Sequence, residues 1–124
     1  MQIISGNLVE FIMKESYSAI PTNTKLALKE ALADSIACTI AGTATQVYEI
    51  VKKFTETQYG RGNSSIFMSP LKLSATGASL VNATAANALD MDDGHRLTKG
   101  HPGAVVLPAV FAAAEEFNRS GEEF

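Results

Sequence analysis

The residues with the strongest potential for chemistry gather in the segment 87–108. It contains both histidines of the chain and three carboxylates, namely Asp90, Asp92, Asp93, His95 and His101. A histidine oriented by a carboxylate can act as a general acid or base, because its imidazole takes up and releases protons near neutral pH. We expect the ring of His101 to face Asp90 or Asp93 across a loop. His95 has the weaker case, and a lone histidine is more often structural or simply exposed.

The crowding of the three carboxylates has two interpretations. If Asp90 lies on the end of a helix, Asp90 and Asp93 share one face of it and Asp92 points elsewhere. Carboxylates at a helix C-terminus meet the negative end of the helix dipole, and an arrangement that lowers stability favours a functional site. Alternatively, they are solvated charges neutralised by the neighbouring cations Arg96 and Lys99.

Other sites that use such residues fit the pattern less well. An EF-hand loop beginning at Asp90 would need glycine at its sixth position and glutamate at its twelfth, where this chain has His95 and His101. Residues 90–93 also match the short acidic motif of some terpene cyclases, which is a weak signal alone. No His-x-x-x-His pair or cysteine cluster is present, so we predict no metal and no cofactor. Cys38 lies in an apolar repeat, which predicts a buried and inert thiol.

Composition and charge argue against several function classes. The chain has 124 residues, a single-domain length, with a formal net charge of −3 and no long basic run. We therefore expect no nucleic-acid partner and no membrane-adhesive surface. The first residues lack the regions of a signal peptide, and no window approaches the roughly 18 apolar residues of a membrane span. Because Cys38 is the single cysteine, we expect a reduced, cytoplasmic setting.

The helices that must position the segment 87–108 follow from the spacing of apolar residues. The first, of about three turns, is predicted from Leu8, Phe11, Ile12 and Ala19. Between residues 24 and 41 an apolar residue recurs every fourth position, which predicts the second: Leu28, Leu32, Ile36 and Ile40. The alanines around this stripe suggest that neighbouring helices approach closely. Gly42 then occupies the position of a left-handed C-terminal residue.

Three further helices are predicted over residues 45–59, 75–89 and 104–117, so the fold class is all-α, a bundle of about five helices. Residues 66–68 are too few to decide between a strand and a packed loop. The last helices are very apolar for so short a chain, as though further protein covered them. The apolar faces of the three helices are Val47, Ile50, Val51 and Phe54; Ala78, Val81, Ala85 and Leu89; and Val106, Val110, Ala113 and Phe117.

Taken together, these motifs resemble the amino-terminal part of the MmgE/PrpD family, which includes 2-methylcitrate dehydratase, cis-aconitate decarboxylase and iminodisuccinate epimerase. The resemblance covers nearly the whole chain. Its most specific parts are the acidic motif, the His-Pro-Gly corner and the Ala-rich helix that follows it. The resembling stretches are residues 32–42, Asn82, residues 87–93, residues 100–103 and residues 108–109.

The resemblance implies an all-helical domain, a smaller α+β lid domain and a homodimer that uses no metal or organic cofactor. It places Asp90 and His101 in the active-site pocket. Their implied work is proton transfer next to a carboxylate of a small di- or tricarboxylic acid, with His101 as acid or base and Asp90 orienting it or the substrate. Such a step creates carbanion character that cations must stabilise. We expect Lys99 and Asp93 to contact the substrate.

The chain departs from the family pattern at three positions near this site. It has Asn87 where the family often has histidine, Met91 where it has an aromatic residue, and Gly94 where dehydrating or decarboxylating members often have threonine. The particular reaction therefore stays open. Further histidine and lysine residues of the family's site fall beyond residue 124. We interpret residues 1–124 as a partial helical domain of a lyase- or isomerase-type enzyme; the alternative is a non-enzymatic helical oligomerisation or interaction module.

Overall fold

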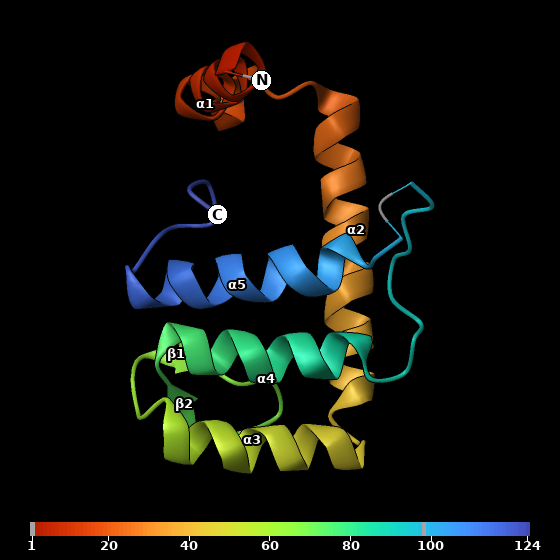
Figure 1. Ribbon diagram of the computed structural model, residues 1–124, viewed down its shortest axis with the longest axis vertical. Helices are drawn as coiled ribbons and strands as arrows, with labels where there is room; N and C mark the ends of the chain where they lie inside the picture. The colour runs from red at the N-terminus through yellow and green to blue at the C-terminus, as the bar shows by residue number, and fades with distance from the viewer. Residues whose placement is uncertain (1, 98) are drawn as a thin grey trace.

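The computed structural model describes residues 2–97 and 99–124, with the side chains of the first helix described from residue 5 onward. This part of the chain forms five α-helices and a two-stranded sheet, which confirms the predicted all-α class (Figure 1). In chain order the elements are α1 (Gln2–Lys14), a 3₁₀ turn (Tyr17–Ala19), α2 (Thr22–Gly42), α3 (Gln46–Gln58), β1 (Ser64–Ser65), β2 (Lys72–Leu73), α4 (Ala75–Asn87) and α5 (Pro102–Glu116).

The starts of three helices follow from the local sequence. The hydroxyl of Thr45 accepts a hydrogen bond from the Tyr48 backbone N–H at 3.4 Å, and Ser74 caps α4 in the same way through Gly77 at 3.3 Å. Both side chains satisfy a backbone N–H that has no partner within the helix. Pro102 opens α5, where its missing N–H is not needed. These caps place the helix starts within a few residues of the predicted ones.

The helices α3, α4 and α5 lie side by side with α4 in the middle, and α2 crosses α4 and α5 (Figure 1). The strands β1 and β2 form an antiparallel hairpin in which Ser64 pairs with Leu73 and Ser65 with Lys72. Residues 66–68, left undecided above, lie in the connection between these strands. Because α4 has neighbours on three sides, it carries more buried residues than any other described helix.

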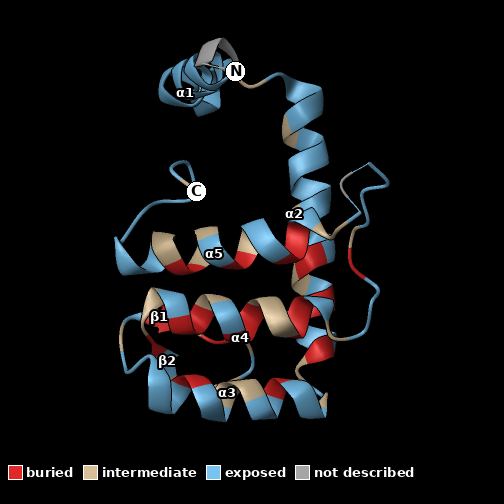
Figure 2. Ribbon diagram, viewed as in Figure 1, coloured by how far each residue is buried: buried red, intermediate tan, exposed pale blue. Residues whose placement is uncertain are grey.

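The core lies around α4 and consists largely of small side chains (Figure 2). The buried polar residue Asn82 ties α4 to the hairpin: its Oδ1 accepts from the Phe67 N–H at 3.1 Å, and its Nδ2 donates to the Ser65 carbonyl at 3.0 Å. Both polar atoms of this buried amide are therefore satisfied. The main core cluster comprises Tyr48, Ile66, Leu73, Ala78, Val81, Ala85 and Ala112.

The prediction that Gly42 ends α2 in a left-handed conformation is wrong. Among the described glycines, the one with positive φ is Gly60, and Gly42 is the last helical residue of α2. A Cβ atom built on Gly42 would lie 1.8 Å from the carbonyl oxygen of Ala85 in α4. Glycine is required here because the two backbones cross too closely for any side chain. The expectation of close helix approach is thus met at this crossing.

Three of the predicted buried faces are also wrong. On α2 Leu28 and Ile40 are 54% and 43% exposed, on α3 Ile50 is 58% exposed, and on α5 and directly after it Val106 and Phe117 are 53% and 68% exposed. The buried positions are instead Ser35, Cys38, Thr39 and Gly42 on α2, Tyr48 and Thr55 on α3, and Gly103, Ala104, Pro108 and Ala112 on α5. Close contact with α4 favours small side chains, so the bulky residues of the α2 stripe are displaced to its outer side. The predicted face of α4 is confirmed for Ala78, Val81 and Ala85.

The amino-terminal part of the molecule is exposed and apolar. The helix α1 ends at Lys14, so Ala19 lies outside it, in the 3₁₀ turn. In Figure 2 the described part of α1 and the first half of α2 are almost entirely exposed. Their outward residues include Leu8, Val9, Phe11, Ile12, Leu26 and Leu28. No helix among the described residues is both long and apolar enough to cross a membrane.

Candidate active site

The loop between α4 and α5, residues 88–101, carries the candidate residues. The helix α4 ends at Asn87, whose carbonyl accepts the Asp90 N–H at 3.0 Å, and Asp90 adopts a left-handed conformation with φ of 52°. Asp90 therefore lies in a turn beyond the helix. The helical geometry that would place Asp90 and Asp93 on one face does not apply.

The second half of the loop is a small hairpin. The His95 N–H donates to the Gly100 carbonyl at 2.9 Å, and the Lys99 N–H donates to the His95 carbonyl at the same distance. Lys99 is exposed, with φ of 55°. This hairpin returns the chain to the start of α5, so that His101 immediately precedes the helix.

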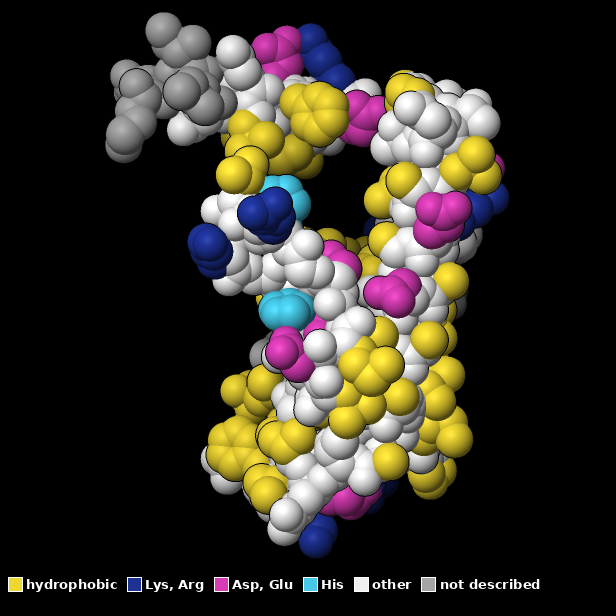
Figure 3. All heavy atoms as spheres, turned by 90° about the vertical axis from the view of Figure 1, so that its right-hand side faces the viewer, with side chains coloured by type: hydrophobic (Ala, Val, Ile, Leu, Met, Phe, Trp, Pro, Cys, Tyr) yellow, Lys and Arg dark blue, Asp and Glu magenta, His cyan; other side chains and the backbone are white. Residues whose placement is uncertain are grey.

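The imidazole of His101 lies between two carboxylates. Its Nε2 is 3.4 Å from Oδ1 of Asp90, and its Nδ1 is 3.3 Å from Oδ2 of Asp92. The ring is partly open to solvent, with 34% of the side chain exposed. Of the two expected partners, Asp90 and Asp93, the structure shows contact with Asp90. The contact with Asp92 was missed, because the assumed helix pointed Asp92 elsewhere. Figure 3 shows a histidine at the surface directly against acidic side chains.

The two carboxylates that contact His101 have opposite environments. The Asp90 side chain is 86% exposed, whereas that of Asp92 is fully buried. The side-chain amide of Asn87, the last residue of α4, donates to both oxygens of Asp92, at 3.1 and 3.3 Å. A buried carboxylate requires such partners. The contact between Asn87 and Asp92 was not predicted from the sequence, since it depends on the turn at Asp90.

The third carboxylate, Asp93, belongs to the start of α5. Its Oδ1 accepts the Gly103 N–H at 2.8 Å, where the positive end of the helix dipole favours an anion. A Cβ on Gly103 would lie 2.5 Å from this oxygen and 2.7 Å from Oγ of Ser35. The close packing leaves one oxygen of Asp93 committed to the helix. Contact of Asp93 or Lys99 with a substrate stays a prediction.

Replacing Asp93 with alanine should lower the free energy of unfolding by about 1 kcal/mol, because α5 loses an N-terminal acceptor. Urea denaturation followed by circular dichroism measures this change. Asp93→Asn is the matched control, since its carbonyl oxygen can still accept the Gly103 N–H. Equal stability of the alanine variant and the original protein would contradict the capping role.

Three potential ligands of a metal ion meet at this point. One ligand atom each from Asp90, Asp92 and His101 lies within 4.8 Å of the others. His101 turns Nε2 toward Asp90 and Nδ1 toward Asp92, so the two carboxylates contact different nitrogens of the ring. Each protonated nitrogen of a charged ring could face one carboxylate.

Cys38 of α2 is buried, as predicted. Burial raises the pKa of the Cys38 thiol, and the negative charges of Asp34, Asp92 and Asp93 raise it further. A thiol held neutral in this way is a poor nucleophile. Cys38 therefore lies beside the acidic loop without providing its chemistry.

A cavity of about 480 Å³ adjoins the candidate site and has room for a small molecule. His101 and Asn87 line it together with Thr84 and with apolar groups of three helices and the loop, which are Val47 of α3, Ala83 of α4, Ala88 of the loop, and Ala104 and Val105 of α5. The functional groups of the loop therefore meet a largely apolar wall.

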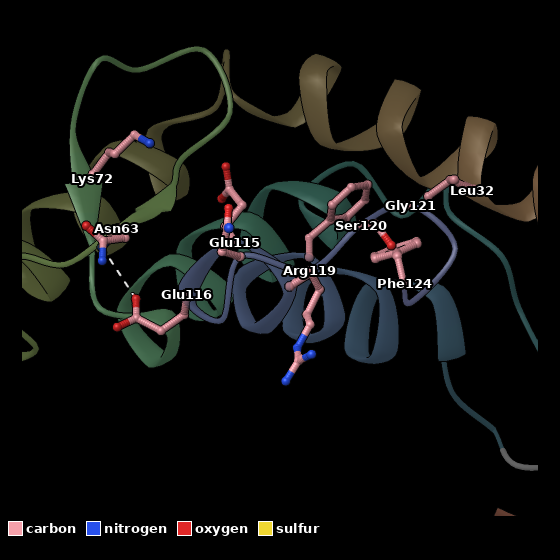
Figure 4. A pocket seen from close by; sticks show the side chains of 12 residues that line it. Leu32, Asn63, Lys72, Glu115, Glu116, Arg119, Ser120, Gly121 and Phe124 are labelled. Atoms are coloured by element: carbon pink, nitrogen blue, oxygen red, sulfur yellow. Dashed lines mark hydrogen bonds between the residues drawn. The ribbon is translucent and has the colours of Figure 1, made fainter.

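A larger cavity, about 770 Å³, lies at the opposite end of α5 (Figure 4). Glu116 there accepts the Asn63 N–H at 3.4 Å, and Glu115 accepts the Ser65 N–H at 2.6 Å. Arg119 pairs with Glu123. These charged groups already tie α5 to the hairpin and to the last turn. The cavity also lies about 20 Å from His101 along the helix, so it is not the candidate site.

The fold and site together define an all-helical domain that presents a histidine between two carboxylates on the loop between two helices. The chain belongs to the MmgE/PrpD family: the model of the MmgE/PrpD N-terminal domain matches residues 6–124. This match confirms the resemblance inferred from the sequence.

Curated relatives support the same assignment. The chain is 28% identical over 112 residues to a cis-aconitate decarboxylase-like protein, oryM, of Aspergillus oryzae, which covers 90% of this chain and 23% of the relative. It is 32% identical over 94 residues to human cis-aconitate decarboxylase, and the match covers 74% of this chain and 19% of the relative. It is 29% identical over 103 residues to the cis-aconitate decarboxylase of Aspergillus terreus, and this match covers 83% of the chain and 21% of the relative. The chain thus spans about a fifth of the length of these relatives.

Proposed function

We propose that this chain provides one wall of an active site that transfers a proton next to a carboxylate of a small di- or tricarboxylic acid. The observation that carries the proposal is His101, a partly exposed imidazole between two carboxylates, in a chain of the MmgE/PrpD family. Relatives named as cis-aconitate decarboxylases favour a lyase reaction on such an acid. Dehydration and epimerisation are alternative outcomes of the same proton transfer.

In this proposal His101 donates or accepts the proton, and Asp90 orients the ring or the substrate. Asp90 suits this role because it is exposed and lies 3.4 Å from Nε2 of His101. Lys99 lies on an exposed turn of the same loop, where its ammonium group could pair with a substrate carboxylate. Loss of a proton or of carbon dioxide leaves negative charge on carbon, which such cations stabilise.

The remaining walls of the pocket come from further protein in this proposal. The cavity beside His101 is open, and the loop provides few cations for a substrate with two or three negative charges. A second copy of the chain in a homo-oligomer, or a polypeptide corresponding to the rest of the relatives, would supply additional groups.

The test is a panel of acids incubated with the intact gene product in D₂O. The panel contains cis-aconitate, 2-methylcitrate, citrate and iminodisuccinate, and NMR follows loss of substrate, products and deuterium uptake next to each carboxylate. We expect one acid to be consumed or deuterated. If every acid remains unchanged with the folded, intact protein, the proposed function is wrong.

A second candidate function is a non-enzymatic helical interaction module. The observation in its favour is the exposed apolar surface of α1 and the first half of α2, where Phe11 and Ile12 are 61% and 60% exposed. Apolar patches of this kind are typical of contact surfaces between proteins. An associating chain that has no effect on any acid of the panel would favour this function.

Both candidates predict that the chain associates in solution. Its molar mass measured by light scattering after size-exclusion chromatography should exceed 13.1 kDa and rise with concentration. A Leu8→Glu, Phe11→Glu variant should shift toward the monomer, because both side chains are exposed on α1. Exchanging the exposed charge of Lys53 on α3 for glutamate is the control. A monomer at every concentration would contradict this prediction.

A further inference from the structure

Among the described residues, the buried carboxylate of Asp92 has one partner on each side. On one side the Asn87 amide donates to both of its oxygens. On the other, its Oδ2 lies 3.3 Å from Nδ1 of His101. Because the Asp92 side chain has no exposure to water, these neighbours decide how its charge is balanced.

The Nδ1 atom of His101 is itself buried and makes no hydrogen bond of good geometry in the described part of the chain. An acceptor, Oδ2 of Asp92, lies 3.3 Å from it. If Nδ1 carried no proton, its lone pair would face the lone pairs of Oδ2 of Asp92. No hydrogen atom would then lie between these two atoms, and they would repel each other. A proton on Nδ1 replaces this repulsion by an attraction to the carboxylate 3.3 Å away.

The opposite nitrogen is in a different setting. Nε2 of His101 faces the exposed carboxylate of Asp90 at 3.4 Å. In the neutral ring with its proton on Nδ1, Nε2 carries the lone pair. Water screens this lone pair from the Asp90 carboxylate, which is 86% exposed, whereas no water reaches the buried carboxylate of Asp92. Nε2 can therefore take up a proton from the outside of the loop and return it, while Nδ1 does not exchange partners.

We propose that Asn87 and Asp92 are positioning residues that hold neutral His101 with its proton on Nδ1, which leaves Nε2 as the nitrogen that exchanges protons. Asn87 fixes the buried carboxylate from the end of α4, and Asp92 fixes the ring. The use of Nε2 in turnover rests on the proposed function. The position of the proton does not, because it follows from the contacts within this chain.

The decisive measurement is the long-range ¹H–¹⁵N NMR spectrum of the ¹⁵N-labelled chain at a pH where the imidazoles are neutral. The protein has two histidines, so His95→Gln assigns the signals. We expect His101 to show a protonated Nδ1 and a bare Nε2. A His101 ring protonated on Nε2 would overturn the proposal. The measurement requires no substitution of His101, Asp90, Asp92 or Asn87.

Two matched variants distinguish the specific effect of Asp92 on the His101 proton from the general effect of removing a negative charge beside the ring. In Asp92→Asn, the new carbonyl oxygen should turn to the Asn87 amide and the new NH₂ group to Nδ1, so that His101 shifts to the Nε2-protonated form. In Asp90→Asn, the same chemical change beside Nε2 should leave the proton on Nδ1. Backbone ¹H–¹⁵N spectra establish that both variants are folded. Equal shifts in both variants, or none in Asp92→Asn, would contradict the assignment.

Turnover by the intact protein provides the second readout. Asp92→Asn should lower kcat by a factor on the order of 10² or more with little change in KM, because the ring presents the wrong tautomer. If the unsubstituted protein turns over none of the acids, the proposed function is refuted, but the NMR result on the protonation of His101 still holds. Unchanged kcat in a variant whose tautomer has switched would refute the use of Nε2.

Discussion

Replacing His101 with alanine should abolish turnover of the polycarboxylate substrate by the intact protein. Removal of a general acid or base lowers a rate by about 10²–10⁴-fold, which brings a modest activity below detection. The fold should remain, because the His101 side chain is partly exposed and lies in a loop rather than in the core. The measurement compares kcat of the two proteins by NMR and their unfolding by urea.

The matched control is His95→Ala, which removes the other imidazole of the same loop. His95 follows Gly94 within the small hairpin and lies outside the pair of contacts made by Asp90 and Asp92. We expect this variant to retain most of the activity. Full turnover by His101→Ala, or equal losses in the two variants, would refute the role given to His101.

Replacing Gly42 with alanine should destabilise the domain by about 3 kcal/mol or more, which is a large part of the stability of a typical domain. In an ordinary helix this change is favourable by about 1 kcal/mol. Here the added methyl group would lie 1.8 Å from the carbonyl oxygen of Ala85. Since that atom belongs to the backbone of α4, the two helices must separate. Urea denaturation measures the loss.

Gly6→Ala is the internal control for this effect. Gly6 lies within α1, and a Cβ built on it has no atom within 4 Å. The same substitution should therefore leave the stability unchanged or raise it by up to about 1 kcal/mol. If Gly42→Ala were as stable as Gly6→Ala, the close crossing of α2 and α4 would not exist in solution.

The three carboxylates of the loop have different surroundings and therefore different contacts. Asp90 is exposed beside Nε2 of His101, Asp92 is buried beside Nδ1, and Asp93 accepts from the first turn of α5. A short chain segment thus orients one imidazole from both sides and fixes the helix that follows it. The loop gains rigidity from α4 through Asn87 and from α5 through Gly103.

The sequence by itself determined the helices and the residues with chemical potential. Apolar spacing and capping residues act within a few positions along the chain, so α2 to α5 begin close to where they were expected. That His101 faces Asp90 or Asp93 also follows from their types and their place on a loop between helices, but the choice of Asp90 does not. The family assignment rests on the same local motifs, and the match over residues 6–124 confirms it.

Only the tertiary structure decided which faces are buried and which carboxylate holds the histidine. At Gly42 the sequence predicts a left-handed residue that ends the helix, but Gly42 is the last helical residue and the close approach of α4 is what requires glycine there. At Asp92 helical spacing points the side chain away from the site, but the left-handed turn at Asp90 rotates it inward to Asn87 and His101. The physical reason is common to both. Burial and partner choice depend on segments distant along the chain, and one residue outside regular helix geometry redirects every side chain after it.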